Sequence, residues 1–256
     1  MQPGVTAGLG KGFQVGFQLP IDLKVSRINY SLLNGDDFTP PYGDLHHRNE
    51  ELFALGDARV MAHWRGGIPG TPLLLGFGVG AALPTGKTED NPFTATALER
   101  WHQHLQFGNG TVDPVVSIQI IVRGQMVGLL VQANTRIPVY ANSKGYQGSK
   151  TINVSAGPTL QLPDKLKTIQ LSLLGEFDAL SPELWDGLPG KNSGIAAAAL
   201  RIGVNWNPIP KLAIQANLLT RVFEHSVGAQ FTRPITLTVG VSGFVDLRKL
   251  KKTHTP

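Results

Sequence analysis

Charged side chains recur at every second position of several segments of this 256-residue chain, a spacing that places them on one face of an extended strand. Seven are cations: Lys24, Arg59, Arg65, Arg123, Arg136, Arg201 and Arg221. Four are acids: Asp22, Asp57, Glu176 and Asp178. An isolated buried charge costs several kcal/mol, so enclosed charges must pair or meet water. Two interpretations stay open: an internal ion-pair network, or a water-filled, mildly cation-lined channel that selects anionic solutes.

Histidine is the second residue type that could carry chemistry. Strand parity places only His63 on the same inward face, and most of the others fall in expected loops. Imidazole is the commonest metal ligand, and neighbouring carboxylates could complete a site. The carboxylates are Asp44, Glu50 and Glu51, and the predicted metal ligands are His46, His47, His102 and His104, with His225 at the same rim.

A divalent metal site competes with simple loop packing. Thr96 and Glu99 have the spacing of a helix-capping box. In the helix that this box would begin, His102 and His104 point about 200° apart and cannot share an ion. In an extended segment they face the same way, so both alternatives remain.

No pattern indicates catalysis. The chain contains no nucleophile elbow, and no spacing fixes a catalytic triad. It also contains no cysteine, which excludes a disulfide framework, a thiolate metal site and a cysteine nucleophile. We therefore expect a protein that is not an enzyme and needs no cofactor beyond the metal considered above.

The positive charge is concentrated at one end. The net charge is +5, and the run Arg248–Lys252 supplies four of these charges, so the body is close to neutral at +1. A nucleic-acid partner is therefore not expected. We divide the chain into a body, 1–247, and a basic tail, 248–256. The first residues lack the basic and apolar regions of a signal peptide, so an exported form would be mature or truncated.

The elements that position these side chains are strands. Between Phe13 and Val25 every odd residue is apolar, and no even residue is a large apolar one. This alternation covers about 40 Å at ~3.3 Å per residue, whereas a tilted membrane strand needs only ~9–11 residues. No apolar stretch reaches the ~18 residues of a membrane helix. Only 16% of residues are charged, against ~25% in ordinary soluble domains.

The alternation recurs along the whole chain, in segments 58–64, 73–83, 116–122, 127–139, 152–162, 169–179, 196–206, 212–222 and 235–245, with Val5–Leu9 as a further candidate. Short, turn-rich connections alternate with long ones, as the periplasmic turns and extracellular loops of an outer-membrane barrel do. The sequence thus predicts an all-β fold, a single antiparallel transmembrane β-barrel. Bacterial barrels have even strand numbers, so we expect about twelve, with 10–12 in this chain and the first native strand missing. A soluble sandwich or lipocalin-like barrel is the alternative.

Several short motifs occur in the loops: Leu55-Gly56-Asp57, Leu83-Pro84-Thr85-Gly86, Phe107-Gly108-Asn109-Gly110-Thr111-Val112-Asp113-Pro114, Pro40-Pro41-Tyr42-Gly43-Asp44 and His46-His47-Arg48-Asn49-Glu50. In this order they resemble the transporter-like outer-membrane proteins of the phenol meta-degradation pathway family, over about residues 10–245. The resemblance implies a barrel in the outer membrane of a Gram-negative bacterium that passes small hydrophobic or aromatic compounds.

These observations predict a channel for passive passage of small molecules. Its expected partners are the lipid bilayer, lipopolysaccharide and a small solute. The alternative is a closed barrel that serves as a surface binding module, with a histidine-rich metal site at its rim.

Overall fold

The computed structural model describes residues 1–27, 29–39, 49–91, 106–163, 166–228 and 234–243, and its sixteen named elements are all β-strands. Among these residues, no helix is long and apolar enough to cross a bilayer. The expected all-β class is confirmed. The segment 248–256, predicted as a basic tail, lies outside the described residues.

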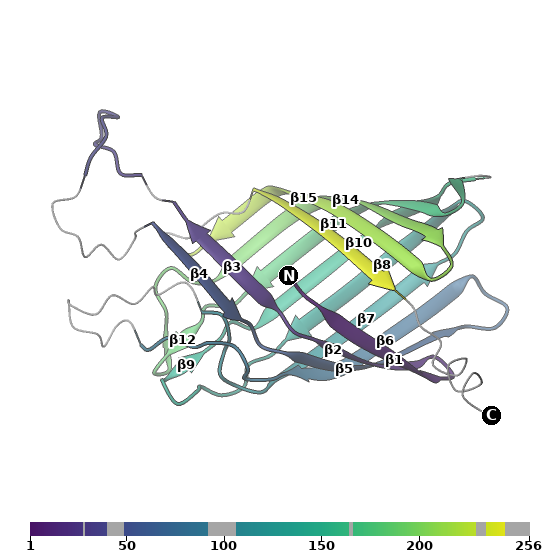
Figure 1. Cartoon of the computed structure of the whole chain (residues 1–256), viewed down its shortest axis with the longest axis horizontal. Coiled ribbons are helices and arrows are strands. Elements are labelled where there is room, and N and C mark those ends of the chain that lie inside the picture. Colours follow the sequence, from purple (N-terminus) through teal and green to yellow (C-terminus); the bar gives the residue numbers. More distant parts are fainter. Residues whose placement is uncertain (28, 40–48, 92–105, 164–165, 229–233, 244–256) are drawn as a thin grey trace, which may run out of the picture.

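One antiparallel sheet dominates the structure (Figure 1). Its eleven strands, in spatial order, are β1 (Gly4–Gly10), β2 (Phe13–Gln18), β5 (Arg59–Gly67), β6 (Leu73–Ala82), β7 (Asp113–Val122), β8 (Val127–Arg136), β10 (Thr151–Gln161), β11 (Ile169–Leu180), β14 (Ile195–Ile209), β15 (Leu212–Ser226) and β16 (Ile235–Gly243). Each strand of this sheet pairs with the strand of the sheet that follows it in the chain. Strands β3, β4, β9, β12 and β13 lie outside this sheet. The number equals the ten clear alternating segments plus the further candidate at Val5–Leu9.

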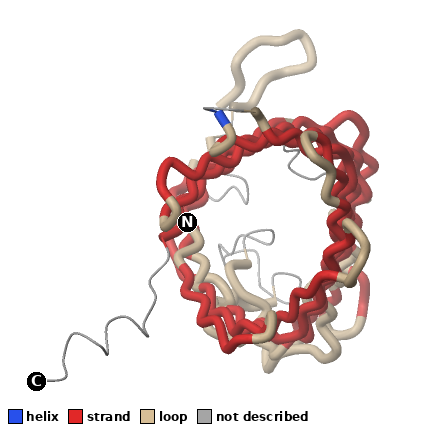
Figure 2. Tube along the Cα trace, turned by 90° about the vertical axis from the view of Figure 1, so that its right-hand side faces the viewer, coloured by secondary structure: helices blue, strands red, loops and turns tan. Residues whose placement is uncertain are grey.

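The sheet curls round on itself (Figure 2). Its edge strands are β1 and β16, and no backbone pairing between them is recorded in the described part of the chain. Ten successive antiparallel pairings separate the two edges, so β1 and β16 run in the same direction. An antiparallel closure therefore requires one more strand between them.

The two faces of the curled sheet have opposite character. Large apolar side chains face outward and are exposed, as in the row formed by Leu173 (49%), Ile202 (57%) and Leu218 (44%). On the concave face, by contrast, Ser155 is 1% exposed and Asp113 is fully buried. The polar residues thus point inward and the aliphatic rows point away from the interior, which is the inverse of a soluble core.

Glycines give the concave face room for larger neighbours. On β6 the inward positions include Gly78, and a Cβ there would lie 2.4 Å from the Ser117 hydroxyl and 2.5 Å from His63 Nδ1. The side chains of β5 and β7 therefore lean across β6. This explains why the sequence of β6 alternates large apolar residues with glycine.

The long segment expected at Phe13–Val25 is two strands. β2 ends at Gln18, and β3 (Ile21–Ser26) pairs with β4 (Glu50–Leu55) in a separate hairpin. Pro20 lies at the break and has no backbone N–H to donate. The hairpin extends past the long-loop end of the main sheet (Figure 1).

Loop lengths differ between the two ends, as predicted. Short turns such as 68–72 and 210–211 join strands at one end, and long connections such as 83–112 and 181–194 join them at the other. A small three-stranded sheet lies among the long connections and consists of β9 (Tyr146–Gln147), β12 (Leu184–Trp185) and β13 (Leu188–Pro189). We call this end of the molecule the rim.

Candidate functional site: the rim and the concave face

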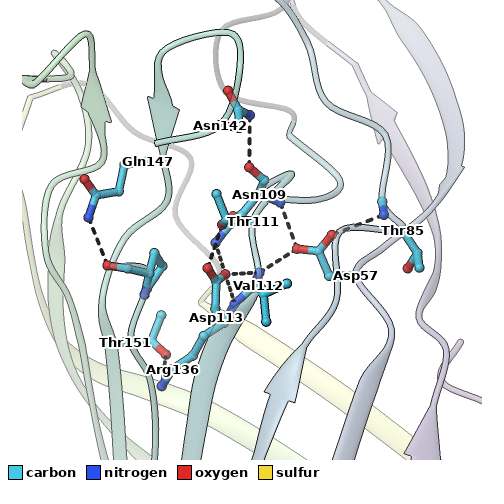
Figure 3. A network of polar contacts seen from close by, with 12 residues as sticks. Asp57, Thr85, Asn109, Thr111, Val112, Asp113, Arg136, Asn142, Gln147 and Thr151 are labelled. Carbon is cyan, nitrogen blue, oxygen red and sulfur yellow. Dashed lines mark hydrogen bonds and ion pairs between the residues drawn. The ribbon is translucent and has the colours of Figure 1, made fainter. Parts of the chain in front are cut away.

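Three of the loop motifs meet at one place on the rim, around Arg136 (Figure 3). Asp57 comes just before β5, Asp113 begins β7 and Arg136 ends β8. We call Asp57, Asp113 and Arg136, with Asn109 and Thr111, the rim cluster. It joins residues as far as 79 positions apart in the sequence.

Arg136 connects both carboxylates. Its Nε donates to Asp113 Oδ2 at 2.7 Å, and its Nη2 lies 2.5 Å from both Asp113 Oδ2 and Asp57 Oδ2. The side chains of Asp113 and Asp57 are 0% and 1% exposed. A planar guanidinium can form several such bonds at once, so it compensates two carboxylates that could not remain buried alone.

Asp57 also holds two long loops against the strands. Its Oδ1 accepts from the backbone N–H of Gly86 at 3.1 Å, and its Oδ2 accepts from that of Asn109 at 2.8 Å. This close approach requires glycine at Gly86 and Gly108, because a Cβ at either would lie 2.6 Å from the other's Cα. The Gly86 and Gly108 positions of the two motifs are thus explained by packing.

The remaining bonds of the cluster fix Asp113. The Thr111 hydroxyl donates to Oδ1 at 2.6 Å, and the Asn109 amide donates to Oδ2 at 2.7 Å. The amide of Asn142 in turn donates to the Asn109 carbonyl at 3.0 Å, which ties in the next long loop. The cluster therefore holds three loop segments in place over the strand ends.

A second group of charges lies further down the concave face. Arg201 Nε lies 3.1 Å from Glu176 Oε2, and its Nη2 donates to the Ser155 hydroxyl at 2.9 Å. The Asn153 amide donates to Glu176 at 3.0 Å and to Asp178 at 2.7 Å. These residues face each other across β10, β11 and β14, which the alternation placed on one side.

Arg221 pairs with Glu224, a partner that the alternation missed. The register between β14 and β15 shifts at a bulge, where Ala199 lies opposite Arg221 and Ala198 opposite Phe223. The bulge leaves Val222 as an extra residue, so Val222 and Phe223 are both exposed and Glu224 turns inward. Strict period-two counting from Leu218 would place position 224 outward.

Toward the short-turn end the charges are fewer. Arg65 Nη2 donates to Gln119 Oε1 at 2.7 Å, and His63 lies on the same face. Arg59, the first residue of β5, is half-buried and lies instead at the rim end, just after Asp57 in the chain. Arg123 is exposed in the turn after β7 instead of on a strand.

The charges of the concave face are balanced in the described part of the chain. The inward charges described above are Arg59, Arg65, Arg136, Arg201 and Arg221 against Asp57, Asp113, Glu176, Asp178 and Glu224. Strand β3 adds one residue of each sign, Lys24 and Asp22. The sequence-based excess of cations omitted Asp113 and Glu224. Most of the charges are paired, so the ion-pair network exists, and a general preference for anions has no basis in this face.

The predicted metal ligands His46, His47, His102 and His104, with Asp44, lie outside the described residues, and the metal site stays a prediction. His225 is described and exposed, and Glu51 pairs with Arg27. Among the described residues, no group of three or more histidines or carboxylates could hold an ion.

A cavity of about 280 Å³ opens beside the rim cluster. The lining side chains that matter for its chemistry are Lys24, Gln106, Asn109, Arg136, Tyr146 and Glu183. We call it the rim cavity. No pattern in the sequence indicated it, because its walls come from β3, the rim ends of β8, β10 and β11, and three long loops.

Tyr146 and Glu183 in the wall of the rim cavity form a hydrogen-bonded group with Trp185. The Tyr146 hydroxyl donates to Glu183 Oε2 at 3.1 Å, and Trp185 Nε1 donates to Oε1 at 3.4 Å. The two rings are 4.7 Å apart, and both residues are at most 5% exposed. Burial raises the pKa of the Glu183 carboxyl above its ordinary value, although both donated bonds oppose this rise.

This raised pKa predicts a pH-dependent local stability. The folded loop holds the Glu183 proton more tightly than the unfolded loop. The stability that protonated Glu183 gives to the folded loop is therefore full below the ordinary pKa of the unfolded loop and is lost as the pH rises through the raised pKa of the folded loop. We expect amide hydrogen exchange in residues 183–190, corrected for its intrinsic rate, to accelerate over that range. Glu183→Gln should remove the effect, and an equal acceleration in that variant would contradict the assignment.

The fold is similar to that of a solved outer membrane channel. One solved structure that it matches is the COG4313 outer membrane channel from Pseudomonas putida F1, with a TM-score of 0.63 and 12% sequence identity over 95% of this chain and 82% of that one. No family model matches the sequence, and no curated protein matches it. The resemblance to the phenol-pathway family therefore stays a prediction.

Proposed function

We propose that this protein is a channel of the Gram-negative outer membrane that passes small solutes passively. The single observation that carries the proposal is the inverted distribution of side chains. Large apolar residues around the sheet are exposed, while serine, asparagine and charged residues line the concave face. Such a surface is stable when its outer face meets lipid hydrocarbon.

We further propose that the sheet closes as a twelve-stranded barrel. The parallel direction of β1 and β16 supports this, because one additional antiparallel strand satisfies both edges. The bilayer and the lipopolysaccharide leaflet would then surround the apolar rows. Small hydrophobic or aromatic compounds, which the sequence resemblance implies, are the proposed solutes. No catalytic role is part of the proposal.

Liposome swelling tests the proposal. Vesicles that contain the folded protein should swell in an isotonic solution of a small neutral sugar at least ~10-fold faster than vesicles with heat-unfolded protein. Equal rates would contradict a channel.

A matched pair of variants connects the flux to the concave face. Ser172 and Leu173 are neighbours on β11 that face opposite sides, and Leu173 is 49% exposed. Ser172→Trp should slow swelling several-fold by narrowing the path, and Leu173→Trp should leave it unchanged. Slower swelling with Leu173→Trp than with Ser172→Trp would contradict a solute path along the concave face.

A further inference from the structure

The rim cavity presents positive groups although the concave face as a whole is balanced. The Asp57 and Asp113 carboxylates that neutralise Arg136 are fully buried behind it, and neither lines the cavity. Lys24 is the second cation in the wall. A solute in the cavity therefore meets the guanidinium and the ammonium, but not the carboxylates that compensate Arg136.

Both cations are held in place before any solute arrives. The Lys24 ammonium donates to the Gln106 carbonyl at 2.8 Å and lies 4.3 Å from the centre of the Phe107 ring. Arg136 is fixed through Nε and Nη2, and among the described residues no acceptor is recorded for its Nη1. Donors that are already ordered lose little entropy when an anion binds.

Two further residues of the wall suit a ring. Tyr146 and Leu180 line the cavity, and its volume is near the lower end of the ~300–1,000 Å³ typical of small-molecule sites. Glu183 is the one carboxylate in the lining, and its two oxygens accept from Tyr146 and Trp185. Its raised pKa weakens the negative charge that it would oppose to an anion.

We propose that the rim cavity is a binding site for small single-ring organic carboxylates, held by Lys24 and by Nη1 of Arg136. This proposal rests on the proposed function, since it specifies the solute that the channel would collect at its rim. The carboxylate would bind at the cation pair, and the ring would lie toward Tyr146 and Leu180. Local charge at the rim, rather than the charge of the whole concave face, would then provide selectivity.

Calorimetric titration of the folded full chain in detergent tests this with three probes of one ring size: benzoate, benzyl alcohol and benzylammonium. We expect benzoate to bind at least ~10-fold more tightly than either of the others. Equal affinities, or tighter binding of benzylammonium, would overturn the proposal.

Two variants locate the site. Lys24→Gln should lower the affinity for benzoate at least ~5-fold and leave the affinity for benzyl alcohol unchanged. The control is Lys144→Gln: Lys144 pairs with Asp90 at 2.8 Å at the same end of the molecule but does not line the cavity. An equal effect of the two variants would refute the site.

A salt titration of the unmodified protein gives an independent test that no folding defect can affect. A rising chloride concentration should weaken the binding of benzoate and leave the binding of benzyl alcohol unchanged. A benzoate affinity that does not depend on chloride would refute the site. If the protein passes sugar but does not prefer benzoate, only the proposed binding site is refuted. If the protein binds benzoate but does not pass sugar, only the proposed channel function is refuted.

Discussion

Replacing Arg136 with methionine is expected to lower the free energy of unfolding by about 3–5 kcal/mol. The substitution leaves Asp57 and Asp113 buried without their cation, at 1% and 0% side-chain exposure. Methionine preserves most of the volume, so the loss reports charge rather than packing. Denaturant unfolding in lipid vesicles, followed by tryptophan fluorescence, measures it.

The matched control is Arg65→Met on the same face. Arg65 donates to the neutral amide of Gln119, and no ion pair of Arg65 is recorded among the described residues. Its substitution should cost less than ~1 kcal/mol. Equal losses in the two variants would show that Arg136 does not depend on its carboxylates. Restoring stability by adding Asp57→Asn and Asp113→Asn to Arg136→Met would support the assignment.

The second large effect is expected on the outer face. Leu218 lies near the middle of β15 and is 44% exposed, in register with Ile202 of β14. Leu218→Arg should destabilise the folded protein in a bilayer by about 2–4 kcal/mol, because arginine near the midplane of a membrane barrel must leave water.

The neighbouring residue provides the control. Asn217 faces the concave side, where its Oδ1 would lie 2.6 Å from a Cβ placed on Gly203. Asn217→Arg should cost less than ~1 kcal/mol, since the charge meets water or inward polar groups. Urea unfolding of both variants in vesicles compares the two faces at adjacent positions. A larger loss for Asn217→Arg would mean that the faces are assigned the wrong way round.

Period-two alternation predicted the strands and their faces because a strand with lipid on one side repeats its chemistry every second residue. It placed Arg201, Glu176 and Asp178 on one face, and β10, β11 and β14 pair without irregularity at those positions. It failed at Glu224, where the bulge beside Ala198 shifts the phase by one residue. A bulge leaves no clear mark in a run of residues as uniform as Leu212–Val222.

The rim was harder to predict for a different reason. Asp113 shares its face with Val115, an apolar residue that is 9% exposed, so the alternation of β7 is broken where the cluster begins. Arg136 and Asp57 meet only because the intervening strands, β6 and β7, fix their separation. Asp57 and Asp113 both belong to the quoted loop motifs, but their common partner depends on the register of the whole sheet.

The rim cavity had no signal in the sequence. Tyr146, Glu183 and Trp185 come from two long connections and contact each other through β9 and β12, elements of two residues each. Contacts between loops follow from tertiary packing rather than from periodicity. A cavity of this kind is visible only once those loops are placed.

The most direct test of the account is single-channel recording with cysteine at Asn217 or Leu218. The chain contains no cysteine, so any effect of a negatively charged thiol reagent reports the introduced residue. We predict discrete conductance steps in both variants, and a change in step size after the reagent for Asn217→Cys alone. Silent membranes, or a blocked current in Leu218→Cys with none in Asn217→Cys, would contradict a solute path along the concave face.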